Sequence, residues 1–134
     1  LGGTYAPTWY NTPAALLPHT PKDDKRRHFV REEVEACKRL RDIDVLMTHE
    51  AARPFIVVRE GRPGATGRRT DAGKPAINDV LATLTPRLHL CGHHHRFVET
   101  DREGVRSVCL DRVSRSYLLI DAGTLEYEKV DQVR

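Results

Sequence analysis

The sequence predicts an α/β fold in which two helices flank a mixed sheet and β-hairpins follow near the C-terminus. Two short apolar segments, 45–48 and 88–91, have the length and composition of buried strands, and histidine follows each of them. An amphipathic helical pattern precedes each segment, over 29–41 and 75–84. Further along, the pattern changes to short apolar stretches between turn residues, which is typical of hairpins.

Composition and length indicate a domain, or part of one, without a membrane segment. The chain has 134 residues, 31% of them charged, with a net charge of +3 and a mean hydropathy of -0.54. No apolar run approaches the roughly 18 residues that span a bilayer, and no signal-peptide pattern is visible. Cys37, Cys91 and Cys109 lack CxxC spacing and are interpreted as reduced thiols. We therefore expect a cytoplasmic protein with no membrane partner.

The first part of the chain alternates between irregular and regular segments. Residues 1–5 are interpreted as a strand end that runs into a Gly-Gly turn. Residues 6–28 carry several prolines without apolar periodicity, so we expect a long loop with one helical turn at 14–17. Apolar residues at helical spacing favour a helix over 29–41. The strand 45–48 is apolar on both faces, which predicts a sheet covered on both sides.

The middle of the chain is basic and glycine-rich. We expect residues 50–73 to be irregular, except that 55–58 form a short strand or a docked apolar patch. A P-loop NTPase is excluded, because the glycine spacing is wrong and Pro75 follows Lys74 where Ser or Thr is needed. Pro75 suits the first turn of a helix, and the pair at 85–86 ends it.

Two hairpins are predicted after the second histidine segment. Their strands are expected at 97–100 with 105–109, and at 116–120 with 125–130. Each pair is separated by a short polar stretch that contains glycine, which is the usual signal for a hairpin turn.

Histidines at the ends of two predicted strands indicate a metal site. His49 ends the first strand, and His93 and His95 follow the second after Gly92, whose flexibility would let both side chains turn to one side. Sites in open α/β sheets form at the carboxyl ends of strands, and imidazole suits Zn, Cu, Fe and Ni. The alternative is that these histidines form an ordinary polar turn.

Three other residues near these strands are given different roles. His94 is expected to point away from the metal, toward solvent or substrate. Arg53 lies four residues after His49 and is the arginine best placed to contact an anionic substrate. His89 alternates with leucines and is interpreted as a strand residue in a polar contact.

These residues resemble a known family. The motif Thr48-His49 after a strand, and later Gly92-His93-His94-His95, are similar to the last two metal motifs of the calcineurin-like metallophosphoesterases, whose signature is Gly-His-x-His. The resemblance implies an α-β-β-α sandwich of two packed sheets with helices outside. It also implies two divalent metal ions (Mn, Fe, Zn or Ni) that share a hydroxide attacking phosphorus. His49 and His93 would bind the second ion, and His95 the first.

The family's first motifs, Asp-x-His, Gly-Asp and Gly-Asn-His-Asp/Glu, are absent from this sequence. They supply the bridging aspartate and further ligands. We therefore expect residues 1–134 to be the C-terminal portion of such a domain, inactive without the N-terminal half. An unpaired sheet edge and an apolar surface should mark the place of that half, and such surfaces also favour homo-oligomers.

The predicted function is metal-dependent hydrolysis of a phosphate monoester or diester, with nucleotides and nucleic acids among the candidate substrates. Two alternatives stay open. His49, His93 and His95 could hold a single Zn with one position open for water, and Glu50 would be the nearest base. The chain could also be a non-catalytic domain that kept the fold.

Overall fold

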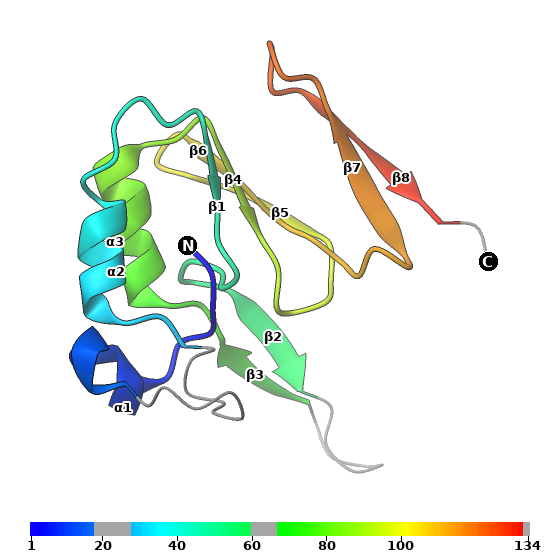
Figure 1. Cartoon of the computed structure of the whole chain (residues 1–134). Coiled ribbons are helices and arrows are strands. Elements are labelled where there is room, and N and C mark those ends of the chain that lie inside the picture. The colour runs from blue at the N-terminus through cyan, green and yellow to red at the C-terminus, as the bar shows by residue number, and fades with distance from the viewer. Residues whose placement is uncertain (18–27, 60–66, 133–134) are drawn as a thin grey trace.

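A four-stranded mixed sheet forms the centre of the structure, a computed structural model that describes residues 1–17, 28–59 and 67–132 (Figure 1). The strands lie in the order β1-β4-β6-β5. Their bounds are Val45–Met47 for β1, Leu88–Cys91 for β4, Val98–Arg102 for β5 and Val105–Cys109 for β6. Strands β1, β4 and β6 are parallel, whereas β5 is antiparallel to β6. The predicted mixed sheet is confirmed.

Helix α3 (Pro75–Leu84) has the bounds that its sequence predicts. Pro75 occupies the first turn, where a backbone N–H has no partner inside the helix and its absence costs nothing. Thr85 ends the helix in the left-handed conformation, with φ 43°, and its backbone N–H donates to the Leu81 carbonyl at 2.8 Å.

Helix α2 (Arg31–Cys37) is shorter than the predicted 29–41. It begins after Val30, whose backbone N–H donates to the Glu33 carboxylate at 2.9 Å. Beyond Cys37 the N–H groups of Arg39 and Leu40 bond to carbonyls three residues earlier, so the chain tightens into turns and leaves the helix.

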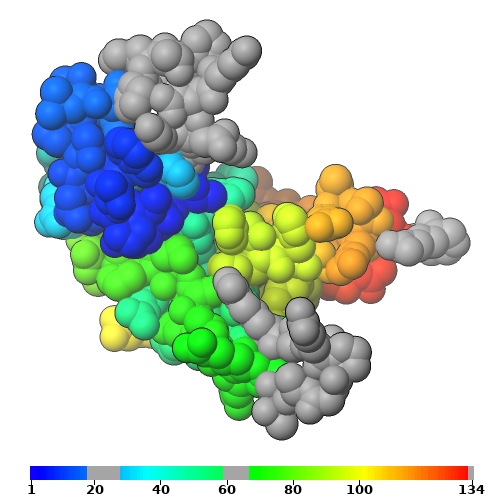
Figure 2. Space-filling view, turned by 90° about the horizontal axis from the view of Figure 1, so that it is seen from below, coloured from blue at the N-terminus to red at the C-terminus, as the bar shows by residue number. Residues whose placement is uncertain are grey.

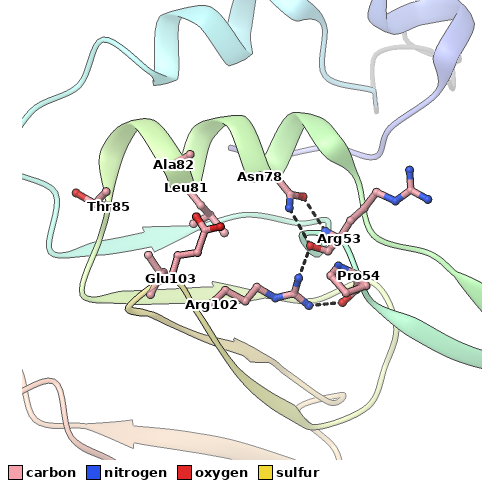
Figure 3. A pocket seen from close by; sticks show the side chains of 9 residues that line it. Arg53, Pro54, Asn78, Leu81, Ala82, Thr85, Arg102 and Glu103 are labelled. Carbon is pink, nitrogen blue, oxygen red and sulfur yellow. Dashed lines mark hydrogen bonds between the residues drawn. The ribbon is translucent and has the colours of Figure 1, made fainter.

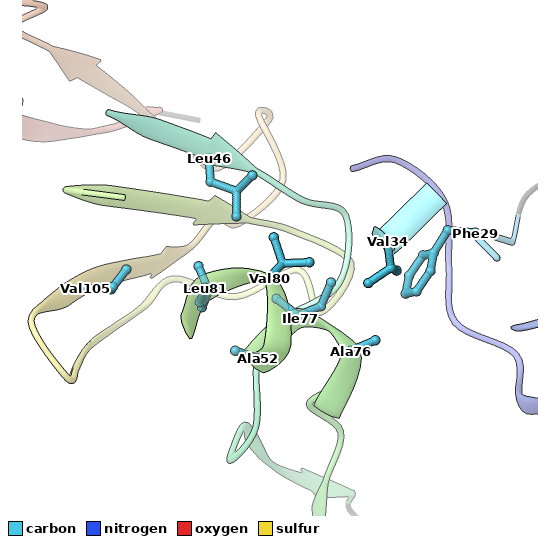
Figure 4. Packing of buried hydrophobic residues seen from close by; sticks show 9 residues of the cluster. All are labelled: Phe29, Val34, Leu46, Ala52, Ala76, Ile77, Val80, Leu81 and Val105. Atoms are coloured by element: carbon cyan, nitrogen blue, oxygen red, sulfur yellow. The ribbon is translucent and has the colours of Figure 1, made fainter. Parts of the chain in front are cut away.

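Both helices cover one face of the sheet. The main hydrophobic core lies between the helices and the strands (Figure 4). Ile77 and Val80 of α3 are fully buried and face Leu46 of β1. The cluster consists of Phe29, Val34, Leu46, Ala52, Ala76, Ile77, Val80, Leu81 and Val105. The burial of these apolar side chains in a close-packed layer is the main source of stability on this side of the sheet.

The opposite face is covered by the C-terminal hairpin of β7 (Ser116–Ile120) and β8 (Tyr127–Asp131). Leu118 and Ile120 from this hairpin pack against a buried cluster that includes Leu88 and Leu90. Figure 2 shows the hairpin projecting from the body of the molecule. Both predicted hairpins are therefore confirmed, β5–β6 inside the sheet and β7–β8 against its second face.

The prediction that strand 45–48 is covered on both faces is wrong. Strand β1 lies at an edge of the sheet, and the Met47 side chain is 63% exposed. The β7–β8 hairpin packs on the cluster that contains Leu88, Leu90 and Val108. The Met47 side chain at the β1 edge is not part of this cluster and stays largely exposed. The Leu1 ammonium group continues the pairing of β1, because it donates to the Met47 carbonyl at 2.7 Å. The exposed Met47 side chain is an apolar surface at this edge, and the packing of an N-terminal half on it stays a prediction.

A further hairpin was missed in the segment predicted to be irregular. Strand β2 (Ile56–Arg59) confirms the short strand expected near 55–58, and it pairs with β3 (Arg68–Asp71), which the sequence did not predict. Strand β3 consists of polar residues, so its sequence shows no alternation of apolar and polar residues that would predict a strand. The carboxylate of Asp71 accepts backbone N–H groups of Phe55 and Gly73 at 2.8 and 3.0 Å, which holds the base of the hairpin together.

The N-terminal segment contains two single turns of helix, α1 (Pro7–Tyr10) and η1 (Ala14–Leu16). The turn predicted at 14–17 is confirmed as η1, whereas α1 was not expected. The remainder of the predicted loop 6–28 lies partly outside the described residues, as does the centre of 50–73.

The architecture is thus mixed α/β with a mixed sheet, three α-helices among the described residues and C-terminal hairpins. It shows one helical layer on one main sheet, and the two-sheet sandwich implied by the resemblance is not shown. Within the described ranges, none of the helices combines the length and apolar character needed to span a bilayer.

Candidate functional site

Neighbouring parallel strands bring His49 and His93 to the same edge of the sheet. Residue Met47 of β1 pairs with Leu90 of β4, so both strands end at the same level. The Gly92 N–H donates to the His49 carbonyl at 3.2 Å, which extends the pairing beyond both strands. The two histidines predicted at the strand ends therefore meet, as the topological rule for parallel sheets requires.

The His49 and His93 rings are in direct contact. His49 Nε2 lies 2.9 Å from His93 Nδ1, and the rings are nearly perpendicular at 88° with their centroids 4.9 Å apart. Both side chains are exposed. At 2.9 Å the two nitrogens share one proton in a hydrogen bond, and a metal ion bound by both nitrogens would have to displace that proton.

After β4, the residues that turn the chain are histidines and not Gly92. His93 and His95 adopt positive φ angles of 65° and 50°, whereas Gly92 does not. A Cβ atom added to Gly92 would meet only the His49 carbonyl oxygen, at 4.0 Å. The prediction that Gly92 provides the tight turn is therefore wrong; the left-handed residues, a conformation that histidine adopts more readily than most, provide it.

His95 does not join the other two histidines. Its Nδ1 lies 3.1 Å from Arg112 Nη2, in the loop that follows β6. A guanidinium has only donors, so Nδ1 accepts this hydrogen bond and the proton of the neutral ring is on Nε2. In this arrangement neither nitrogen of His95 offers a free lone pair.

The metal fit is therefore partial. Two imidazole ligands of one tetrahedral Zn lie roughly 3.3 Å apart, given bonds of about 2.0–2.1 Å, so His49 and His93 at 2.9 Å fit one ion after a small adjustment. Among the described residues, no group of three or more His, Cys, Asp or Glu side chains gathers as a metal site. The second ion implied by the resemblance has no ligand set in this part of the chain.

His94 points inward. Its ring stacks on Phe55 with centroids 4.5 Å apart and 22° between planes, and Nε2 is buried without a hydrogen-bond partner among the described residues. Burial lowers the pKa of His94, and the neighbouring His93 lowers it further. The ring is half-buried, contacts His93 and turns its Nε2 into the interior. Its contact with substrate stays a prediction.

Glu50, the nearest candidate base, is buried with only 2% of its surface exposed. Its Oε1 accepts the backbone N–H of Tyr5 at 2.9 Å, and Oε2 lies 3.8 Å from Lys74 Nζ. A carboxylate held in this way anchors the N-terminal segment and the start of α3 to the loop after β1. It faces the interior, although the adjacent His49 is exposed.

Arg53 is placed beside α3 and not among the histidines. Its Nε donates to Asp71 Oδ2 at 2.8 Å, so its charge is paired. Arg53 lines a cavity of about 490 Å³ under α3 whose lining contains no histidine (Figure 3). Figure 3 shows the Arg102 guanidinium donating to the carbonyls of Arg53 and Pro54. The contact of Arg53 with substrate stays a prediction.

His89 is the strand residue in a polar contact that its sequence position predicts. The Thr48 hydroxyl donates to the Glu50 carbonyl at 2.6 Å, so it accepts from His89 Nε2 at 2.8 Å. The Ser107 hydroxyl lies 3.1 Å from Nδ1 and donates to it. Burial lowers the pKa of this fully satisfied ring to about 4, with a smaller effect from the Arg102 charge.

Arg112 is the residue near the site that sequence reasoning missed. It lies 17 positions from His95, and no local motif links the two. The signal would have been the parallel pairing of β6 with β4, because residues after β6 then emerge at the same edge as the histidines.

Comparisons with known proteins show the fold alone. No family model matches the chain, and no curated protein matches it. A solved crystal structure is similar, with a TM-score of 0.57 and 15% identity over 86% of this chain and 45% of that chain. The chain thus spans less than half the length of that solved chain. A likeness at this identity indicates a shared arrangement of strands and helices, and a fold does not determine function.

Proposed function

We propose that this chain is part of a metal-dependent phosphoesterase domain of the calcineurin-like type. The observation that carries the proposal is the convergence of His49 Nε2 and His93 Nδ1, 2.9 Å apart at the carboxyl ends of two neighbouring parallel strands. Both residues occupy the motif positions that the resemblance assigns to one metal ion. Imidazole suits Zn, Fe and Ni, and Mn would need oxygen ligands from the rest of the site.

The fold supports the same proposal. A groove of about 280 Å³ lies between the main sheet and the β7–β8 hairpin, lined largely by apolar side chains such as Leu90, Phe97 and Ile120. Together with the exposed Met47, this surface suits the packing of another apolar layer.

In this proposal the residues of the chain form one wall of the site. His49 and His93 hold one divalent ion, and the stacked pair of His94 and Phe55 supports the His93 loop from behind. When bound, a divalent ion polarises a phosphoryl oxygen and makes a water molecule more acidic. Ligands for the rest of the site, and a general acid, would come from the N-terminal half of the domain.

The experiment that tests the proposal measures metal binding and hydrolysis in the full-length protein. We expect Mn²⁺ or Zn²⁺ to bind and to activate cleavage of bis(p-nitrophenyl) phosphate. His49→Ala and His93→Ala should each lower the metal affinity and reduce the rate by at least about 100-fold, since each removes a direct ligand. His28→Ala serves as the control, because this histidine lies at the N-terminal bridge and bonds to Thr4.

Different outcomes separate the three candidate functions. Metal binding without any hydrolysis would leave a non-catalytic metal domain. Equal metal content in the wild type and both histidine variants would contradict the proposal. Loss of a bound ion in His95→Ala as well as in the other two variants would favour a single ion held by three histidines.

A further inference from the structure

The loop between β6 and β7 places an arginine beside the histidine loop. β6 pairs in parallel with β4, and the Leu110 N–H donates to the Cys91 carbonyl at 2.8 Å, so both strands open at one edge. Two residues later, Arg112 reaches His95 with a separation of 3.1 Å between Nη2 and Nδ1. Segments that are distant in sequence therefore build one exposed corner next to His93.

The backbone of Arg112 is held in place by its own turn. Its N–H donates to Asp111 Oδ1 at 2.7 Å, and its carbonyl accepts the N–H groups of Arg115 and Ser116 at 2.8 and 3.2 Å. The side chain is exposed, yet its base is fixed by three hydrogen bonds. A fixed base lowers the entropy lost when the guanidinium binds a partner.

The side chains of Arg112 and His95 offer hydrogen-bond donors to a ligand. Arg112 donates to His95 Nδ1, which leaves the other guanidinium N–H groups free and a proton on His95 Nε2. The ion pair of Asp111 is with Arg115, whose Nη1 lies 3.5 Å from Oδ2, and the backbone N–H and the charge of Arg112 also help to lower the pKa of this carboxyl group. Among the described residues, no carboxylate forms an ion pair with Arg112. A guanidinium beside a ring N–H matches the chemistry of a bound oxyanion.

We propose that Arg112 and His95 form a phosphate-binding site at this corner. The guanidinium grips two phosphate oxygens as a fork, and His95 Nε2–H donates to a third. A carboxylate has two oxygens and would leave the His95 donor unused, so phosphate is the better match. That the phosphate belongs to the ester substrate rests on the proposed function; that the corner binds phosphate does not.

A contrast with Arg53 supports this assignment. The Arg53 guanidinium is already paired with Asp71 at 2.8 Å, so a ligand would have to displace a carboxylate. Arg112 instead contacts a neutral ring and forms no ion pair within the part of the chain that the structure describes. Phosphate therefore gains more at Arg112 than at the arginine that the sequence singled out.

The test titrates inorganic phosphate into the metal-free full-length protein and follows the histidine ring and arginine side-chain signals by NMR. We expect shifts at His95 and Arg112, and an increase in Kd of about tenfold or more in Arg112→Gln, the size expected when a charged hydrogen-bond donor is lost. Arg112→Lys should fall between the two, because it keeps the charge and loses the fork.

Arg87→Gln is the matched control, since Arg87 is an exposed arginine at the opposite end of β4 and is 57% accessible. Its Kd for phosphate should stay within about twofold of the wild type. An unchanged Kd in Arg112→Gln, or equal weakening in Arg87→Gln, would overturn the inference. Loss of a bound metal ion in His95→Ala would also overturn it, because His95 would then be a ligand.

Failure of this inference is distinguishable from failure of the proposed function. In the metal-free titration, His49→Ala should bind phosphate as the wild type does, whatever its activity. A protein that never hydrolyses phosphodiesters but loses phosphate affinity in Arg112→Gln would refute the function and keep the site. In an active protein, Arg112→Gln should raise KM more than it lowers kcat.

Discussion

The two faces of the central sheet differ in how completely this chain covers them. On the helical face, Ile77 and Val80 of α3 are fully buried against the strands. On the other face, the β7–β8 hairpin covers the β4–β6 side, while Met47 at the β1 edge is 63% exposed. The difference shows that the helical face is a finished core, whereas the second face keeps an apolar margin that is available for packing.

The largest effect is expected from Ile77→Ala on the finished face. Removing a fully buried isoleucine side chain leaves a cavity between α3 and β1, and should reduce the free energy of unfolding by about 2–5 kcal/mol. Urea unfolding followed by circular dichroism measures it. A loss below about 1 kcal/mol would mean that this layer is not the main core.

A second prediction concerns how the free energy of unfolding depends on pH through the buried His89. The pKa of His89 is lowered to about 4, so the unfolded chain, with a histidine pKa near 6.5, binds more protons between these values. Stability from this group is complete above pH 6.5 and is lost as pH falls toward 4, by roughly 3 kcal/mol.

Comparing the wild type with His89→Gln isolates this contribution. The difference in unfolding free energy between the two proteins should shrink as the pH falls from 7 to 4.5, because glutamine does not titrate. A constant difference across this range would show that His89 titrates equally in both states.

A smaller effect is expected from Gly73→Ala, at the junction of β3 and α3. The added Cβ would lie 2.4 Å from the Ala52 carbonyl oxygen and 2.6 Å from Arg53 Cα, so the backbone must shift, at a cost of about 1–3 kcal/mol. Gly92→Ala is its control at the open edge and should change stability by less than about 0.5 kcal/mol. Similar losses in both variants would contradict the close approach at Gly73.

The smallest effect is expected from Met47→Ala on the uncovered margin. Because most of the side chain is exposed, the unfolding free energy of this chain should change by less than about 0.5 kcal/mol. In the full-length protein, a destabilisation above about 1 kcal/mol would reveal that a second layer packs on Met47. Equal, negligible effects in both contexts would show that this margin is plain surface.

Much of the fold followed from local patterns. Apolar runs before His49 and His93 predicted β1 and β4, and Pro75 predicted the start of α3. The hairpin β2–β3 was missed on its second strand, because Arg68–Asp71 is polar and its pairing depends on the carboxylate of Asp71. Such a strand carries no hydrophobic period that a sequence pattern could detect.

The candidate site was predictable in part. Strand ends that carry histidine predicted the contact between His49 and His93, because parallel neighbours end at one edge. The direction of His95 was not predictable, since it depends on a left-handed φ of 50° and on an arginine that arrives from another strand. An exposed side chain takes its orientation from contacts of this kind and not from its neighbours in sequence.

By itself, the sequence determined the bounds of α3, the places of the central strands and of both C-terminal hairpins, and that histidines follow two of the strands. These features depend on neighbouring residues, through hydrophobic period, proline and turn chemistry. Only the tertiary structure decided which ring nitrogens meet, that Gly92 is not the turning residue, and that Met47 is exposed. The histidine rings meet partners 44 and 17 positions away in the sequence, and such contacts form only when the parallel strands are assembled.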